Sequence, residues 1–310
     1  MNSKIGISII VCNYKGSLED ILFTLKSSIH QKGIEYEVLF CDDGSDNCHI
    51  NEIFDFIKAN NVKNCRLLLN DKNVGTVKNI LNGVKEATYD FVKPIGVGDS
   101  FYSETTCRDV VNFMRTNSLD ISFSDAVYFT NDASNTNVHN FAQPAVRDIY
   151  NLETLDREKI IKNLLLYRDF FLGATLFYKK DRFEQYLKKF ENKIIYEEDI
   201  INIASIIEGA KIARFPHYGV FYEFSGGITN NRSSFIDKLN KDTKTLFGYV
   251  KDHTDIPYRV KAYELCDFYT SKIKKVVKSP SSLFFKLKAK KAINKKKDEV
   301  SFAFFENCRG

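Results

Sequence analysis

The sequence predicts an α/β protein built on a mostly parallel central sheet with helices on both faces. Its first hundred residues alternate short β-branched runs with segments whose apolar residues recur at helical spacing. Strands that follow one another through helices pair in parallel, because a parallel connection requires a crossover. The chain has 310 residues, 44% hydrophobic and 27% charged. A chain of this size and composition can bury a sizeable core, unlike disordered, collagenous or coiled-coil proteins.

Each element of this first part has a local signal. Residues 5–12 form a β-branched run typical of a buried strand. Residues 18–29 carry apolar side chains at helical spacing, and Ser17 is suited to cap that helix. The same criteria predict, in order, a strand over 37–41, a helix over 50–59, a strand over 65–69, a helix over 74–87 and a strand over 90–95.

Beyond residue 100 the signals are mixed, and from about residue 235 they are helical, with breaks at Pro257 and Pro280. We therefore predict an α/β domain over 1–234 and a helical, lysine-rich C-terminal region over 235–310. The elements predicted between residues 100 and 223 are a helix over 104–116, strands over 120–123 and 127–130, a loop over 131–140, a helix over 157–167, a strand over 173–178, helices over 182–190 and 199–207, and an extended segment over 211–223.

Charge is concentrated in residues 271–297, the basic tail, which hold eleven lysines and no acidic residue. The basic tail therefore has a charge of +11. Because the net charge of the whole chain is +5, the remaining residues have a net charge of −6. A lysine run is usually a solvated face. Here apolar residues such as Val276 and Leu283 interleave with the lysines, which favours an anionic membrane surface. Nucleic acid is the weaker alternative, since the tail matches no recognition fold, and we predict no such partner.

Composition also indicates where the protein works. No apolar run approaches the roughly 18 residues that a membrane-spanning helix needs, and the N-terminus lacks the small-residue cleavage site of a signal peptide. The seven cysteines are scattered without a Cys-x-x-Cys pair, which argues against a disulfide framework or a structural zinc site. We expect a cytoplasmic protein, peripheral at the inner face of the plasma membrane.

Polar clusters follow the predicted strands, where ligands of open α/β sheets bind. Asp42-Asp43-Gly44-Ser45 is by itself most often a turn, but its carboxylates suit a nucleobase N–H or a ribose hydroxyl. Asn73-Val74-Gly75 opens a helix whose first amides, with Lys78, could face a phosphate. The spacing matches neither the dinucleotide-binding Gly-x-Gly-x-x-Gly pattern nor a P-loop.

Two further clusters carry acidic residues. Gly96-Val97-Gly98-Asp99 is either a simple turn or a place where the backbone approaches a ligand beside Asp99, a hard oxygen donor for Mg²⁺ or Mn²⁺. Glu198-Asp199 begins a predicted helix, where acids complement the helix dipole. The alternative is that one of these two carboxylates is a general base.

As an ordered set, these clusters resemble the family 2 nucleotide-sugar glycosyltransferases, which have the GT-A fold. The resemblance covers about residues 5–230. Within the family, the chain resembles the bacterial capsule and lipopolysaccharide O-antigen type. Lys78 stands where the family usually has Arg. The residues that carry the resemblance are Asn13-Tyr14, the run from Leu25 to Gln31, Tyr36-Glu37-Val38, Asp42-Asp43-Gly44-Ser45, Asn73-x-Gly75, Lys78-Asn79, Gly83, Glu198-Asp199 and Gly226-Gly227-Ile228-Thr229.

The resemblance implies transfer of a sugar from a nucleotide diphosphate, most simply UDP, to a hydroxyl of a polyprenyl-diphosphate-linked glycan, with inversion at the anomeric carbon. It implies Asp199 as the general base, with Glu198 as the alternative, and Asp99 as the ligand of Mn²⁺ or Mg²⁺. The residues expected at the nucleotide sugar are Asn13, Tyr14, Asp42, Asp43, Gly75, Lys78 and Gly98.

One departure from the family pattern leaves alternatives open. Many relatives carry Asp-x-Asp where this chain has Gly98-Asp99 with a single acid, so the completion of the metal shell is undetermined. The single acid favours a catalytically silent relative that binds a nucleotide sugar or membrane glycan as a scaffold, whereas the intact Glu198-Asp199 favours an enzyme. A nucleotidyltransferase is disfavoured, because residues 13–17 are not a Gly-rich basic loop.

Overall fold

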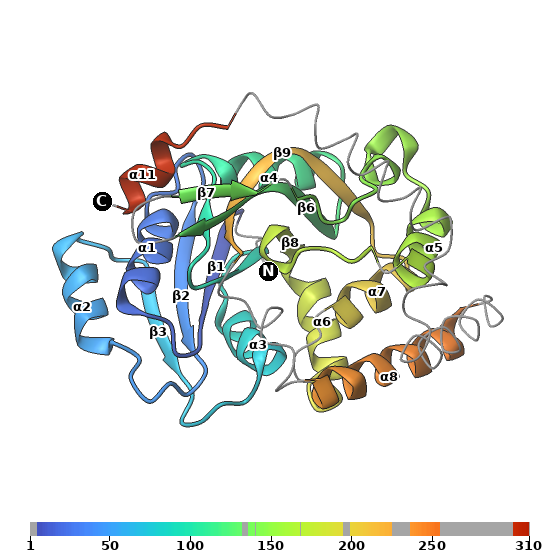
Figure 1. The fold of residues 1–310 in the computed structure, drawn as a ribbon, viewed down its shortest axis with the longest axis horizontal. Coiled ribbons are helices and arrows are strands. Elements are labelled where there is room, and N and C mark those ends of the chain that lie inside the picture. The colour runs from blue at the N-terminus through green and yellow to red at the C-terminus, as the bar shows by residue number, and fades with distance from the viewer. Residues whose placement is uncertain are drawn as a thin grey trace.

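The computed structural model of the chain describes residues 5–131, 136–139, 141–167, 169–194, 199–224, 236–254 and 300–309. Nine strands of these residues form one sheet, in the order β3-β2-β1-β4-β8-β6-β9-β5, with β7 paired to β6 off that path. Helices lie on both sides of the sheet (Figure 1). The predicted α/β class is confirmed. In the described part of the chain, no helix has the length and apolar character needed to cross a membrane.

The first half of the chain supplies the parallel strands. β1 pairs in parallel with β2 and β4, and β2 pairs with β3. Ser17 caps α1 as predicted, because its Oγ accepts a hydrogen bond of 3.1 Å from the Asp20 amide. All predicted elements here are confirmed with small shifts at their ends. They are β1 (Ile7–Asn13), α1 (Leu18–Ile29), β2 (Tyr36–Asp42), α2 (Ile50–Ala59), β3 (Cys65–Leu69), α3 (Thr76–Glu86) and β4 (Phe91–Gly96).

The second half mixes strand directions. β8 is antiparallel to both β4 and β6, whereas β9 is parallel to β6 and antiparallel to β5. Short 3₁₀ turns lie at 148–150, 152–154 and 173–175. The longer elements are β5 (Ser100–Phe101), α4 (Thr106–Thr116), β6 (Ile121–Asn131), β7 (Thr136–His139), α5 (Arg157–Tyr167), β8 (Leu176–Lys179), α6 (Lys180–Phe190), α7 (Asp199–Ile207), β9 (Ile212–Glu223), α8 (Ile236–His253) and α11 (Ala303–Arg309).

Three predictions for this half are corrected. The two strands predicted over 120–123 and 127–130 are one strand, β6, because register shifts around Asp125 accommodate the polar residues that suggested a break. The predicted loop over 131–140 contains β7, whose polar sequence forms a strand by antiparallel pairing with β6. Of the strand predicted over 173–178, the first three residues are a 3₁₀ turn.

Apolar side chains cover both faces of the sheet, and one buried lysine lies among them. Lys93 of β4 is fully buried. Its Nζ donates hydrogen bonds of 2.8 Å to the Pro94 carbonyl and 2.6 Å to the Ala174 carbonyl, and it lies 5.0 Å from the ring centroid of Phe177. Because a buried ammonium is costly without partners, these carbonyls fix where Lys93 lies.

The C-terminal helix α11 packs back onto the α/β core beside α1 (Figure 1). Phe305 is only 2% exposed. Its ring centroid lies 5.2, 5.0 and 4.6 Å from those of Phe23, Phe129 and Phe221. The Ser301 amide also donates a 2.9 Å hydrogen bond to the Tyr102 hydroxyl.

The C-terminal region was predicted to be helical. The helices α8 and α11 agree with the predicted helical character of residues 235–310. The boundary at residue 234 stays a prediction, and the basic tail, 271–297, lies outside the described residues.

The aromatic contacts of Phe305 predict that Phe305→Ala lowers the free energy of unfolding by about 3–5 kcal/mol, the usual cost of emptying a buried Phe site. Chemical denaturation measures this difference. The matched control is Phe54→Ala on α2, where the ring is 53% exposed and the expected change is within about 0.5 kcal/mol. Equal effects of the two substitutions would contradict a core role for α11.

Candidate functional site

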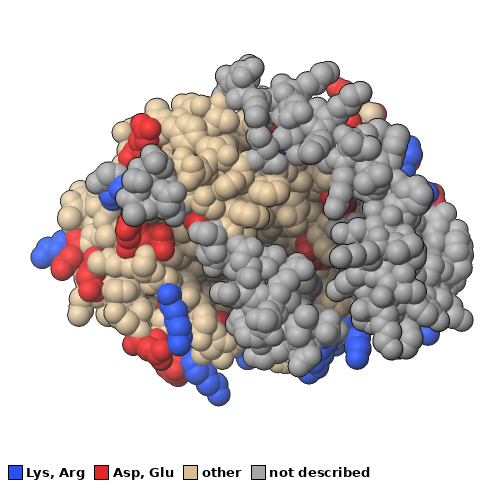
Figure 2. All heavy atoms as spheres, viewed as in Figure 1, with Lys and Arg blue, Asp and Glu red and all other residues tan. Residues whose placement is uncertain are grey.

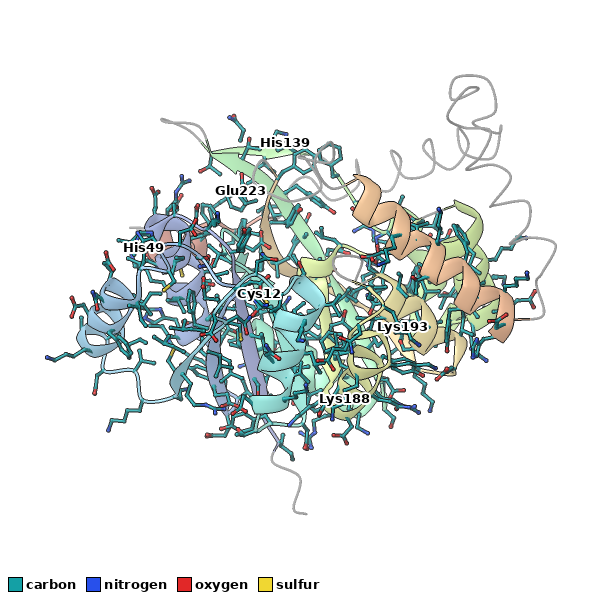
Figure 3. All side chains as sticks on the ribbon, turned by 90° about the horizontal axis from the view of Figure 1, so that it is seen from below. Cys12, His49, His139, Lys188, Lys193 and Glu223 are labelled. Atoms are coloured by element: carbon teal, nitrogen blue, oxygen red, sulfur yellow. The ribbon has the colours of Figure 1, made fainter. Side chains whose placement is uncertain are left out.

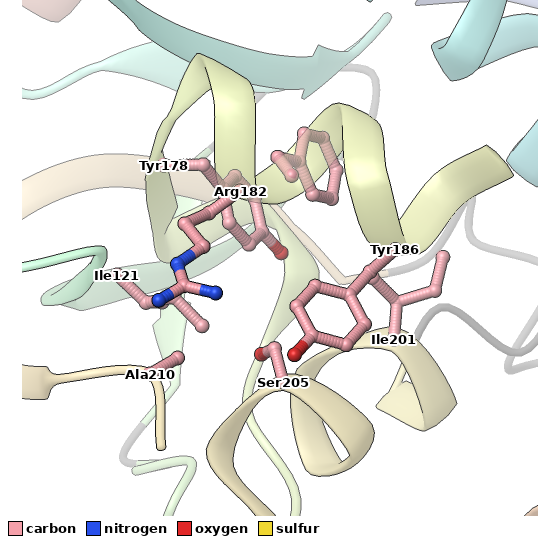
Figure 4. A pocket seen from close by; sticks show the side chains of 8 residues that line it. Ile121, Tyr178, Arg182, Tyr186, Ile201, Ser205 and Ala210 are labelled. Atoms are coloured by element: carbon pink, nitrogen blue, oxygen red, sulfur yellow. The ribbon is translucent and has the colours of Figure 1, made fainter. Parts of the chain in front are cut away.

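The parallel strands bring three of the four predicted clusters, those of Asp42-Asp43, Asn73-Val74-Gly75 and Gly98-Asp99, to one edge of the sheet. The register places Asn13 opposite Asp42 and Cys12 opposite Gly96, so β1, β2 and β4 end side by side. In Figure 2, acidic side chains are visible in the hollow near the centre of the face. By contrast, the pocket in Figure 4 lies between α6, α7 and the opposite end of the sheet. Its volume of about 10 Å³ holds roughly one water, so it is too small for a nucleotide.

Asp42 joins the loops that follow β1 and β2. Its Oδ1 accepts hydrogen bonds of 2.7 Å from the Asn13 amide group and 2.7 Å from the Ser45 hydroxyl, and Oδ2 accepts one of 2.8 Å from the Ser45 amide. Asn13 and Asp42 are 1% and 2% exposed. A carboxylate offers about four acceptor positions, so three bonds leave Asp42 one position for a ligand. Tyr14, next along the chain, is 49% exposed, and Lys15 Nζ lies 5.4 Å from its ring centroid.

Asp43 fastens the end of β2 to the start of α3. Its two oxygens accept hydrogen bonds of 2.7 Å from the Val74 amide and 3.0 Å from the Gly75 amide. Burial raises the pKa of Asp43, and these amide bonds oppose the rise. The Gly75 amide, predicted to face a phosphate, is directed at Asp43 instead. Gly44 permits this approach. Its φ of +70° favours glycine, and a Cβ at this position would lie 2.3 Å from the Lys72 backbone.

Lys78 lies on the first turns of α3, next to this junction. It is half-buried. Among the described residues it has no ion pair or hydrogen-bond partner. Its ammonium is thus a cation at the site edge that the described part of the chain does not neutralise.

Asp99 is held in place by contacts from two distant parts of the chain. Its Oδ1 accepts a 2.9 Å hydrogen bond from the Glu223 amide at the end of β9. The Thr24 hydroxyl of α1 donates to the Asp99 carbonyl at 2.8 Å and accepts from the Gly98 amide at 3.0 Å. Gly98 adopts a φ of +98°, which favours glycine. The second carboxylate oxygen, Oδ2, accepts no hydrogen bond from the described residues.

Burial dominates the chemistry of Asp99, which is 7% exposed. Desolvation raises its pKa to about 8, and the negative charge of Glu223 adds to the rise. The Glu223 amide bond and the charge of Lys93 act in the opposite direction.

The donor chemistry of Asp99 fits a divalent cation. Within the described ranges, no three His, Cys, Asp or Glu side chains gather to form a complete metal site. Mg²⁺, however, is usually held by one or two carboxylates together with substrate phosphates. The hard Oδ2 of Asp99 is a donor of that kind.

Asp199 is the first residue of α7 and is half-buried. Burial raises the pKa of Tyr150, and the negative charges of Asp169 and Asp199 add to the rise, so the Asp199 carboxylate lies within electrostatic reach of that phenol. Tyr150 is fully buried. Glu198, the alternative base, and Gly226 to Thr229 lie outside the described residues.

A buried ionic cluster on β6 and β9 was not predicted. The Asp125 carboxylate, 1% exposed, receives two bonds of 2.9 and 2.6 Å from Arg214 and one of 2.8 Å from Arg147. Burial raises the pKa of Asp169, and hydrogen bonds to its carboxylate, together with the charge of Arg147, oppose the rise. The partners are far apart in sequence. The one signal available was a charged residue inside an apolar strand.

The chain is similar to known proteins in sequence and in fold. The family model described as "Glycosyl transferase family 2" matches residues 8–187. No curated protein matches significantly. Solved structures of S. aureus TarS residues 1–349 are similar. The complex with UDP-GlcNAc has a TM-score of 0.59 and 14% identity over 93% of this chain and 80% of that one. The complex with UDP has a TM-score of 0.56 and 14% identity over 87% and 73%.

This similarity confirms the predicted fold. The chain has the GT-A architecture, a curled mixed sheet flanked by helices. It covers 49% of the longer TarS chain, which has a TM-score of 0.55 and 14% identity.

The raised pKa of Asp99 predicts a pH-dependent stability in metal-free protein. A carboxyl with a pKa of about 8 when folded and 3.8 ordinarily contributes stability below pH 4 that is lost as pH rises to about 8. Asp99→Asn does not titrate, so its melting temperature relative to wild type should rise by at least about 2 °C from pH 5 to 8 and then level off. Thermal denaturation in a chelator measures this. A constant difference across that range would contradict it.

Proposed function

The chain belongs to glycosyl transferase family 2, and on that premise we propose that it transfers a sugar from a UDP-sugar to a glycan hydroxyl, with inversion at the anomeric carbon. The observation that carries this proposal is the convergence of Asp42, Asp43 and Asp99 on one sheet edge, each buried and held by hydrogen bonds. The UDP and UDP-GlcNAc in the TarS structures support the choice of a UDP-sugar.

The β1, β2 and α3 ends would hold the donor. The exposed ring of Tyr14 would stack on the base, while the remaining acceptor position of Asp42 would take a base N–H. Asp43 and the Gly75 amide would set the wall beside the ribose, and Lys78 would approach the diphosphate. Holding the donor in one orientation contributes several kcal/mol to catalysis.

The leaving diphosphate requires neutralisation. A Mn²⁺ or Mg²⁺ ion, when bound, supplies that positive charge. Asp99 would hold it through Oδ2, while the Glu223 amide and Thr24 keep the carboxylate and its loop in place. Gly98 would lie beside the diphosphate.

The acceptor hydroxyl is a weak nucleophile and must lose its proton as it attacks. Asp199 would take that proton, with Glu198 as the alternative. The attack occurs opposite the leaving diphosphate, so the anomeric configuration inverts. No covalent sugar intermediate on the protein is needed.

The acceptor we propose is a polyprenyl-diphosphate-linked glycan of a bacterial surface polysaccharide, of capsule or O-antigen type. Such an acceptor lies at the cytoplasmic face of the plasma membrane. The eleven lysines of the basic tail, 271–297, support a peripheral location there, since each lysine near an anionic surface contributes about 1 kcal/mol.

Asp199→Asn should keep UDP binding and lose at least about 100-fold in turnover, because it removes the general base and leaves the donor edge intact. Release of UDP from UDP-GlcNAc, with water as acceptor, reports turnover, and calorimetry reports UDP binding. Asp55→Asn on the exposed face of α2 is the control. Undiminished turnover in Asp199→Asn would remove Asp199 from this role. A wild-type protein that binds UDP without any turnover would favour the silent scaffold.

Replacing the eleven lysines of the basic tail by Gln should abolish sedimentation with vesicles containing anionic lipid and leave UDP binding unchanged. Substitution is preferable to truncation, because truncation would also remove α11 from the core. The control is sedimentation with neutral vesicles, which should be weak for both proteins. Equal binding of both proteins to anionic vesicles would reject the membrane role of the tail.

A further inference from the structure

We propose that Glu223, at the end of β9, supplies the second protein carboxylate for the divalent cation held by Asp99. This inference rests on the proposed function, since the cation is the one that would accompany the donor diphosphate. The loop over 96–99 contains one acid, and the chain offers no second acid within it. The fold brings one from a strand that lies 124 residues away along the chain.

The placement of Glu223 is fixed by its backbone. Its amide donates the 2.9 Å hydrogen bond to Asp99 Oδ1. The strand pairing adds to this constraint, because Ser100 pairs with Phe221 and Phe129 pairs with Glu223. Figure 3 shows Glu223 near the end of β9, beside the β6–β7 hairpin. Residue 223 therefore stays beside Asp99 whatever side chain it carries.

The side chain of Glu223 adjoins the same loop. A Cβ built on Gly98 would lie 3.8 Å from the Glu223 Cβ. The Glu223 side chain therefore starts next to Gly98, in van der Waals contact range of that position. The Glu223 carboxylate is close enough for its charge to act on Asp99. Asp99 Oδ1 is occupied by the amide, and Oδ2 accepts nothing from the described residues.

The nearby Lys93 acts on Asp99 through its charge, but backbone carbonyls hold its ammonium. Lys93 Nζ donates to the carbonyls of Pro94 and Ala174, and its side chain is fully buried in the sheet. Asp99 and Glu223 thus bring two carboxyl groups to the donor edge, close enough for their charges to act on each other. Two carboxylates balance one divalent cation, and oxygens of a bound diphosphate would complete its shell.

A cation held by only two protein carboxylates should bind cooperatively with UDP. With only two protein ligands, Mn²⁺ alone should bind weakly, and UDP and Mn²⁺ should strengthen each other's binding. By linkage, the factor by which Mn²⁺ improves UDP affinity equals the factor by which UDP improves Mn²⁺ affinity. This factor is the quantity that Glu223 should control.

The test is calorimetric titration of UDP into the full chain, with Mn²⁺ and with chelator. Wild type should show a gain in UDP affinity of about 10-fold or more with Mn²⁺, and Glu223→Gln should lose most of that gain, on the scale of removing a group that orients a metal. The affinity for UDP measured in the presence of chelator should be equal in the two proteins. Glu158→Gln, an exposed acid on α5, is the matched control and should behave as wild type.

Glu223→Asp provides a second variant that keeps the charge, and it should retain part of the gain. Broadening of the Mn²⁺ paramagnetic resonance lines on adding UDP gives a readout independent of heat, and thermal denaturation confirms folding. A full Mn²⁺ gain in folded Glu223→Gln would overturn the proposal. Wild type binding UDP equally with chelator would also overturn it while leaving the donor site intact. Failure of wild type to bind UDP under any condition would instead defeat the proposed function.

Discussion

The site depends on carboxylates that are buried and then satisfied by backbone amides. Asp43 takes the amides of Val74 and Gly75, and Asp99 takes that of Glu223. An unpaired buried carboxylate would be costly, whereas several hydrogen bonds to it are strong because the acceptor is charged. Each such carboxylate therefore fixes the loop that faces it.

The bond between Asp99 and Glu223 also joins the two halves of the sheet. Asp99 follows the parallel half, and Glu223 closes β9 in the mixed half. The proposed cation would lie at this junction, so its binding and the alignment of the halves are coupled. On the other half, Asp125 draws Arg147 and Arg214 together. Breaking such a buried pair leaves unmatched charge, so this cluster holds the segment around Arg147 to β6.

The described helices that precede and follow the basic tail in the chain are packed into the core. Tyr249 and Val250 of α8 are buried in the core, and Phe305 of α11 is buried against α1, β6 and β9. The described helices before and after the lysines thus belong to the folded body.

Local sequence signals determined the parallel half of the fold, the Ser17 cap and the clustering of Asp42, Asp43, Gly98 and Asp99. Helical spacing and β-branched runs suffice there, because strands that follow one another through helices pair in parallel and end at the same edge of the sheet. The tertiary structure alone decided the pairing of β7, the continuity of β6, the docking of Phe305, and the meeting of Glu223 with Asp99. β7 depends on pairing with the nearby β6, which its own polar sequence does not indicate. The other three depend on contacts between residues distant in the chain, and no local pattern encodes such a contact. The direction of the Gly75 amide was missed for the same reason, since only the folded chain shows that Asp43 takes it.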